Sequence, residues 1–179
     1  MKEKDLQIGV MGSMADVELQ ESCKNMAIEL GREIAKRGYL LVYGFEGDFS
    51  SLPVIAAKEC EKNGGMTLAF LWGKKGADLG ELNSIRVETG QLRGGGREFP
   101  LILSSDAIIC LGGGSGTLTE IAMAYQAAIP VVVIKGTGGW SEKLAGMFLD
   151  ERKRTKILLA KNSKGAIELA IAEKKNLTR

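Results

Sequence analysis

The sequence predicts an α/β protein: a single doubly wound, Rossmann-like domain over residues 1–179, with helices on both faces of a parallel sheet. Short apolar runs alternate with helical patterns along the chain, which is typical of βαβ units. Glycine-bearing turns follow several of these runs, and no internal repeat or long linker divides the chain. A length of 179 residues suits one domain with a sizeable core.

Seven mainly apolar segments are expected to be strands, and the fourth of them is short and alternating. A strand pattern needs only a few residues when the sheet is covered on both faces. The predicted strands are 6–10, 39–43, 66–71, 84–88, 106–110, 130–134 and 157–160.

The segments between the strands predict helices from their apolar spacing and end signals. The first carries apolar residues at helical spacing from Leu19 to Ile34, with Asp16 as N-cap and Gly38 as its end. The glycine-rich segment 72–83 is expected to be a loop. The remaining predicted helices are 53–62, 97–104, one that starts near Thr117 and includes 121–128, 141–149 and 164–174.

The composition excludes several kinds of chemistry. There is no histidine, so Ser-His catalysis, imidazole acid–base chemistry and histidine metal sites are absent. A net charge of +2 gives no electrostatic case for nucleic-acid or membrane binding. The cysteines Cys23, Cys60 and Cys110 are widely spaced in apolar patterns, which predicts reduced, buried thiols. With no apolar signal region at its start, the chain is expected to be cytoplasmic.

The run Leu111-Gly-Gly-Gly-Ser-Gly-Thr-Leu-Thr-Glu120 is the strongest functional signal. It joins a predicted strand to a helix, an arrangement that directs backbone N–H groups and a helix N-terminus at a phosphate. Glu120 follows one turn into the helix and can face the same crevice, where it would contact ribose hydroxyls or a developing sugar cation rather than phosphate. A surface carboxylate near the helix start is an equal interpretation of this residue. A plain strand–helix junction explains one or two glycines, but not four. The candidate ligand-binding residues here are Gly112, Gly113, Gly114, Ser115, Gly116 and Thr117.

Two other loops follow strands and should lie at the same sheet edge. Gly12 and Ser13 after the first strand can add an N–H and a hydroxyl to the ligand, although a plain turn is an equal interpretation. Gly44, also a candidate ligand-binding residue, begins the loop after the second strand, where Asp48 is expected to form a turn.

Arg97 follows three glycines at a predicted helix start and can present a guanidinium to a phosphate or carboxylate. The alternative is a solvent-exposed arginine on a loop. Arg93 is a weaker candidate of the same kind.

Neither a dinucleotide fingerprint nor a P-loop is present. The first turn departs from G-x-G-x-x-G, no acidic residue closes the second strand, and no Gly-Lys-Ser/Thr follows a glycine run. The helix that includes 121–128 is apolar or small over much of its surface, which favours a homodimer or homotetramer.

These motifs resemble the Lonely Guy (LOG) superfamily, often labelled "lysine decarboxylase-like", which shares a Rossmann-type fold with DNA-processing protein A. The family signature Pro-Gly-Gly-x-Gly-Thr-x-x-Glu corresponds here to Gly112 through Glu120, and Arg97 and Ser105-Asp-Ala107 also match. Thr89-Gly90 and the Gly136-Thr-Gly-Gly-Trp140 loop resemble the branch that includes relatives of molybdenum cofactor carrier proteins.

The resemblance implies a nucleoside 5′-monophosphate phosphoribohydrolase that cleaves the N-glycosidic bond. Arg97 and Glu120 then match the catalytic pair, and a carboxylate would stabilise the oxocarbenium-like transition state. A non-catalytic carrier or sensor of a phosphate-bearing cofactor, such as molybdenum cofactor, is the alternative. No cofactor or metal is required by the residues, and nothing suggests the pyridoxal phosphate lysine of a decarboxylase.

This chain departs from the hydrolase pattern in two places. Gly112 replaces the family proline, and the loop after the second strand carries Glu46 and Asp48 instead of a dense glycine run. These acids add negative charge near the expected ligand, so hydrolase and carrier both remain as hypotheses.

Overall fold

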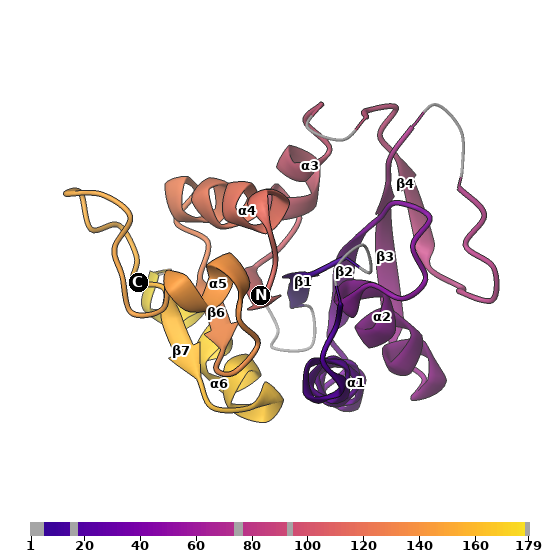
Figure 1. Ribbon diagram of the computed structural model, residues 1–179, viewed down its shortest axis with the longest axis horizontal. Helices are drawn as coiled ribbons and strands as arrows, with labels where there is room; N and C mark the ends of the chain where they lie inside the picture. The colour runs from indigo at the N-terminus through magenta and orange to yellow at the C-terminus, as the bar shows by residue number, and fades with distance from the viewer. Residues whose placement is uncertain (1–5, 15–17, 74–76, 93–94, 178–179) are drawn as a thin grey trace.

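The computed structural model describes residues 6–14, 18–73, 77–92 and 95–177. One parallel sheet with helices on both faces forms the centre of the molecule (Figure 1). The predicted fold class is therefore confirmed.

The strands pair in the order β4-β3-β2-β1-β5-β6-β7, and every pair is parallel. All seven predicted strands are present, with ends within about two residues of the prediction, the usual uncertainty of such boundaries. Their bounds are β1 (Gln7–Gly12), β2 (Leu40–Phe45), β3 (Met66–Leu71), β4 (Ile85–Glu88), β5 (Ala107–Leu111), β6 (Val131–Ile134) and β7 (Leu158–Ala160).

The strand order reverses beside β1, which lies between β2 and β5. The chain moves outward from β1 to β4 and then starts the other half of the sheet at β5. Crevices in doubly wound sheets form at this reversal, beyond the carboxyl ends of the strands. The turn after β5 and the loops after β1 and β2 therefore meet at one edge.

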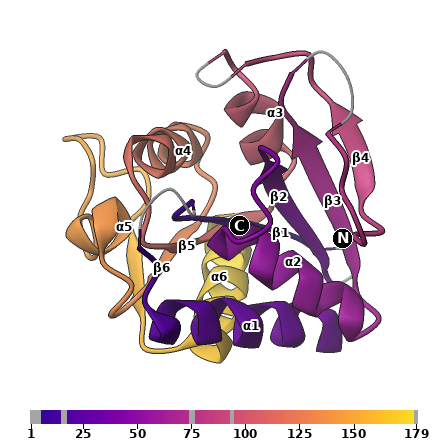
Figure 2. The same cartoon turned by 45° about the vertical axis from the view of Figure 1, so that its right-hand side comes forward.

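Three helices cover each face of the sheet, as Figures 1 and 2 show. One layer consists of α1 (Glu21–Lys36), α2 (Leu52–Lys62) and α6 (Ser163–Leu177). The other consists of α3 (Glu98–Leu103), α4 (Ser115–Gln126) and α5 (Gly139–Lys143).

Alternation along β5 divides the core between the two layers. Ile109 and Leu111 pack with the α1 side, whereas Ile108 and Cys110 pack with the α4 side. Because both faces are buried, the strand is apolar at every position.

Two helix predictions differ from the structure or cannot be compared with it: the N-cap of α1 and the extent of α5. The N-cap of α1 is Gln20, and the predicted cap Asp16 lies outside the described residues. The helix predicted over 141–149 is wrong in extent, since α5 spans only Gly139–Lys143. Gly146 adopts φ +78° and its amide donates to the Ile157 carbonyl at 2.8 Å, which turns the chain away from the helix axis.

The three cysteines are free and buried, as predicted. Across the described ranges, no helix combines the length and apolar character needed to span a bilayer.

Candidate functional site

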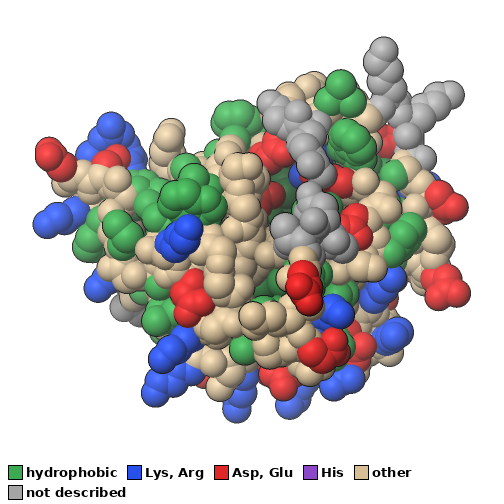
Figure 3. Space-filling model, viewed as in Figure 1, with side chains coloured by type: hydrophobic (Ala, Val, Ile, Leu, Met, Phe, Trp, Pro, Cys, Tyr) green, Lys and Arg blue, Asp and Glu red, His purple; other side chains and the backbone are tan. Residues whose placement is uncertain are grey.

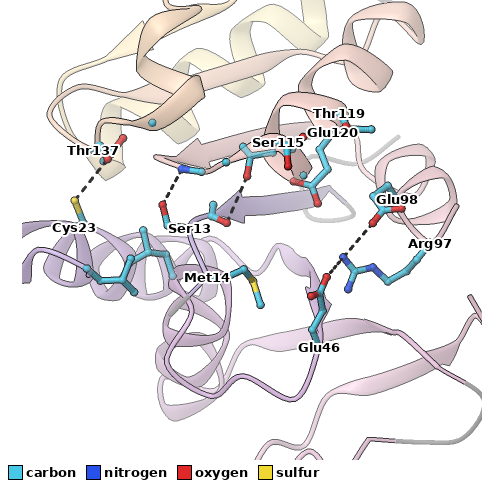
Figure 4. Close-up of a pocket in the computed structure, with 18 of the residues that line it drawn as sticks. Ser13, Met14, Cys23, Glu46, Arg97, Glu98, Ser115, Thr119, Glu120 and Thr137 are labelled. Atoms are coloured by element: carbon cyan, nitrogen blue, oxygen red, sulfur yellow. Dashed lines mark hydrogen bonds and ion pairs between the residues drawn. The ribbon is translucent and has the colours of Figure 1, made fainter. Parts of the chain in front are cut away.

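A pocket of about 680 Å³ lies at the strand-order reversal. Its walls come from the loops after β1, β2 and β6 and from the first turns of α3 and α4 (Figure 4). Figure 3 shows acidic side chains gathered at the recess between α4 and the β2–β3 side of the sheet. The loops that the sequence predicted to cluster do meet here.

Gly112 and Gly113 give the turn after β5 its shape. Their φ angles are +66° and +94°, a region that side chains rarely adopt. A Cβ on Gly113 would collide with Thr117, and one on Gly112 would lie 2.6 Å from Ser13 Oγ. Of these two glycines only Gly113 lines the pocket, so Gly112 shapes the turn from outside the pocket lining.

Side chains from other loops hold this turn in place. The amide of Gly113 donates to Ser13 Oγ at 2.8 Å, and the amide of Gly112 donates to Thr137 Oγ1 at 3.0 Å. The Thr117 hydroxyl donates to the Gly12 carbonyl at 3.5 Å. Ser13 and Thr117 were predicted to contact a ligand; in this structure their hydroxyls brace the turn, although both residues still line the pocket.

The open part of the turn is formed by Gly114, Ser115 and Gly116. A Cβ built on either glycine would meet no atom within 4 Å, so both keep the pocket open. Helix α4 begins at Ser115, and no side chain caps it. The first amides of a helix have no partner within it, and they carry the positive end of the helix dipole. This arrangement suits a small anion.

Arg97 is the N-cap residue of α3 and points into the opposite wall of the pocket (Figure 4). It is only 5% exposed. Its Nη2 lies 2.8 Å from Glu46 Oε1 and 3.5 Å from Glu98 Oε1. Nε and Nη1 are buried without a hydrogen-bond partner. Arg97 is therefore buried and paired with carboxylates, rather than an exposed loop arginine.

Gly44 positions this arginine from behind. A Cβ on Gly44 would lie 3.2 Å from the guanidinium carbon of Arg97. The glycine was predicted to contact a ligand, but it does not line the pocket and instead makes room for the guanidinium.

Glu120 lies on α4 and lines the same pocket as Arg97. Burial raises the pKa of its carboxyl to about 8; Arg97 lowers this pKa, whereas Glu98 and Glu46 raise it. At neutral pH most of this carboxyl is therefore protonated when the pocket is empty.

Glu46 and Glu98 complete an acidic wall of the pocket. Neither residue was predicted from the sequence as a site residue. The negative charge of Glu46 near the ligand was predicted from its loop, and Glu46 does line the pocket. Glu98 was missed, although its place in the first turn of α3 was an available signal.

Other predictions have simpler outcomes. Asp48 forms the expected turn, accepting a hydrogen bond from the Ser50 amide at 2.8 Å. Arg93 lies outside the described residues. No group of three or more His, Cys, Asp or Glu side chains within the described residues is arranged to hold a metal ion.

The model of the SLOG cluster4 family matches residues 5–167. This match confirms the resemblance to the Lonely Guy superfamily that the glycine turn suggested.

Solved structures with the same fold cover nearly the whole chain. The protein TM1055 is 26% identical, with a TM-score of 0.83 over 93% of this chain and 99% of its own. The molybdenum cofactor carrier protein of Chlamydomonas reinhardtii is 32% identical, with a TM-score of 0.77 over 96% and 99%. The molybdenum cofactor binding protein of Rippkaea orientalis is 26% identical, with a TM-score of 0.77 over 94% and 96%.

Proposed function

This chain belongs to the SLOG cluster4 family, and from its pocket we propose that it binds a small phosphorylated cofactor and holds it without turnover. Molybdenum cofactor is the first candidate, because the names of two similar proteins refer to it. The turn of Gly113 to Gly116 would hold the phosphate, and the wider pocket the rest of the molecule.

One observation favours a carrier over a hydrolase: the Arg97–Glu46 ion pair. A hydrolase acting on a nucleotide needs a guanidinium that can engage the substrate. Here Nη2 of Arg97 already lies 2.8 Å from Glu46 Oε1. A ligand phosphate approaching this arginine would meet the Glu46 carboxylate at the same place, so the phosphate is better placed at the α4 turn.

The size and chemistry of the pocket support a cofactor-sized ligand. A pocket of about 680 Å³ lies in the range that holds drug-sized molecules. It combines bare amides with apolar side chains such as Met14 and Leu52. A phosphorylated heterocycle can use both surfaces.

The direct test is retention of the cofactor. Purified protein is mixed with molybdenum cofactor released from a molybdoenzyme, passed through a desalting column, and analysed for bound molybdenum and pterin. We expect stoichiometric retention that excess inorganic phosphate weakens. If no pterin or molybdenum is retained, while the protein stays folded by circular dichroism, this cofactor is not the ligand.

The second candidate function is N-glycosidic hydrolysis of a nucleoside 5′-monophosphate. It is favoured by the position of Glu120, buried beside the phosphate turn with a pKa near 8. A carboxyl that is protonated at neutral pH can donate a proton to a departing base. Incubation with a panel of monophosphates tests this: free base that disappears in Glu120→Gln would replace the carrier proposal.

A homodimer or homotetramer also stays a prediction. The α3 side chains Phe99 and Leu103 are 55% and 65% exposed, and α3 packs beside α4. Exposed apolar side chains of this size favour a protein contact. Light scattering coupled to gel filtration measures the mass directly, and a monomer at micromolar concentration would rule out a stable oligomer.

A further inference from the structure

The pocket has two ends with opposite hydrogen-bonding character. At the α4 turn the protein offers N–H donors. Around Arg97 it offers an excess of carboxyl groups: Glu46, Glu98 and Glu120. A ligand with a phosphate at one end can therefore bring hydrogen-bond donors to these carboxyl groups at the other.

Glu120 is a carboxyl group of this acidic end that a ligand in the pocket can reach. Its residue is only 8% exposed, yet among the described residues no hydrogen bond or ion pair forms at its carboxyl. Its oxygens are not among the sealed side-chain atoms that lack a partner, so they are open to the pocket. Glu120 lines the pocket, so a bound ligand can supply the missing donors.

Apolar surfaces beside Glu120 suit a flat ring. Met123 follows one turn later on α4, so both side chains lie on the same helix face. Phe99 contributes to the pocket wall from α3, two residues after Arg97, and is 55% exposed. Aromatic and thioether groups are good partners for the faces of heterocycles.

We infer that Glu120 recognises the donor edge of a phosphorylated heterocycle, in which an exocyclic amino group stands beside a ring N–H. Guanine and pterin both carry this edge. Two parallel N–H groups match the two oxygens of one carboxylate, while the α4 turn holds the phosphate and Phe99 and Met123 contact the ring faces. The inference rests on the proposed binding of a phosphorylated ligand, and it adds which part of the ligand is selected.

Matched ligands separate this selectivity from phosphate binding. GMP carries both donors and IMP lacks the amino group, so these two form the guanine pair; AMP, which lacks the ring N–H donor, is a further control. A second pair consists of 6-hydroxymethylpterin phosphate and its lumazine counterpart, which lacks the amino group. Affinities are measured by calorimetry at pH 7 in phosphate-free buffers. We expect the amino-bearing member of at least one pair to bind about tenfold tighter or more, since hydrogen bonds to a charged group have this effect.

Proton release supplies an independent readout. N–H donors stabilise the carboxylate, so a ligand with this edge should remove the proton that Glu120 carries in the empty pocket. The heat of binding then varies with the ionisation enthalpy of the buffer, with a slope close to one proton released. A ligand held only through its phosphate gives no release, because added negative charge keeps Glu120 protonated.

The variant Glu120→Gln keeps the shape and removes the ionisable group. We expect the preference for the amino-bearing ligand and the proton release to disappear together, while Glu151→Gln, on an exposed surface residue, keeps both. Thermal unfolding checks that each variant folds.

The outcomes are distinct. Selectivity in the guanine pair or in the pterin pair supports the inference and identifies the source of the edge. Equal affinities within both pairs overturn it but leave phosphate binding intact, and would point to ribose or another hydroxyl as the partner of Glu120. Failure of all these phosphorylated ligands to bind overturns the proposed function as well.

Discussion

The two walls of the pocket are built from different parts of the polypeptide. The α4 wall is backbone: Gly114, Ser115 and Gly116 form the open part of the turn at the start of α4. The α3 wall is side-chain charge: Arg97 lies among Glu46 and Glu98 under nearly complete burial. Backbone amides are fixed once the turn forms, whereas buried charges depend on their partners and on pH. Under the proposed function, the first wall would set where a ligand sits, and the second would set which ligand is accepted.

The acidic wall should show itself most strongly in the pH dependence of stability. Glu120 has a pKa near 8 when folded, against an ordinary value of 4.5. Between these values the unfolded chain binds fewer protons than the folded chain, so the free energy of unfolding falls as pH rises. The contribution of Glu120 to stability is complete below about pH 4.5 and is lost as pH rises to about 8, by about 5 kcal/mol in total at about 1.4 kcal/mol per pKa unit.

Urea unfolding of the wild type and Glu120→Gln at several pH values measures this loss. The difference between the two proteins should change by most of that amount from pH 5 to pH 8.5. Parallel curves would show that Glu120 titrates near its ordinary pKa, and the two walls would then differ less than we argue.

Removing the cation of the acidic wall should have the next largest effect. Arg97→Met removes the positive charge that Arg97 supplies beside the buried carboxyl groups of Glu46 and Glu98, so we expect a loss of about 3 kcal/mol in unfolding free energy. Arg32→Met is the matched control, because Arg32 pairs with Glu59 at 2.7 Å on the exposed surface and should lose less than about 1 kcal/mol. If chemical denaturation gives the two variants equal losses of unfolding free energy, burial does not make the Arg97 pair more important for stability than the Arg32 pair.

Within the backbone wall, Gly113→Ala should destabilise the turn by about 2 kcal/mol, because of its positive φ and the collision with Thr117. Thermal unfolding measures the shift. A variant with wild-type stability would indicate that the turn is flexible, unlike the fixed scaffold described here.

The smallest stability effect should come from Gly116→Ala. Its Cβ meets no protein atom, and alanine favours the helix by up to about 1 kcal/mol. The same Cβ enters the pocket, so the variant should unfold at a higher temperature and bind phosphorylated ligands more weakly. A gain in stability with unchanged affinity would place the phosphate elsewhere.

Much of the fold and one wall of the site were predictable from the sequence. The strand runs and the glycine turn are local patterns: apolar residues at every position of β5 follow from its burial on both faces, and the glycines at 112–116 follow from turn geometry. The length of α5 was not predictable. The helix ends at Lys143, and the chain then turns at Gly146, whose amide donates to the carbonyl of Ile157, eleven residues away in the chain.

The sequence by itself determined the parallel α/β fold, the absence of imidazole chemistry and the position of the glycine turn, since each depends on residues close together in the chain. Only the tertiary structure decided that Gly44 makes room for Arg97, that Glu46 neutralises it, and that Glu120 is buried with a raised pKa. Those properties come from contacts between β2, α3 and α4. Burial and Coulomb interactions act through space, and spacing along the sequence does not encode them.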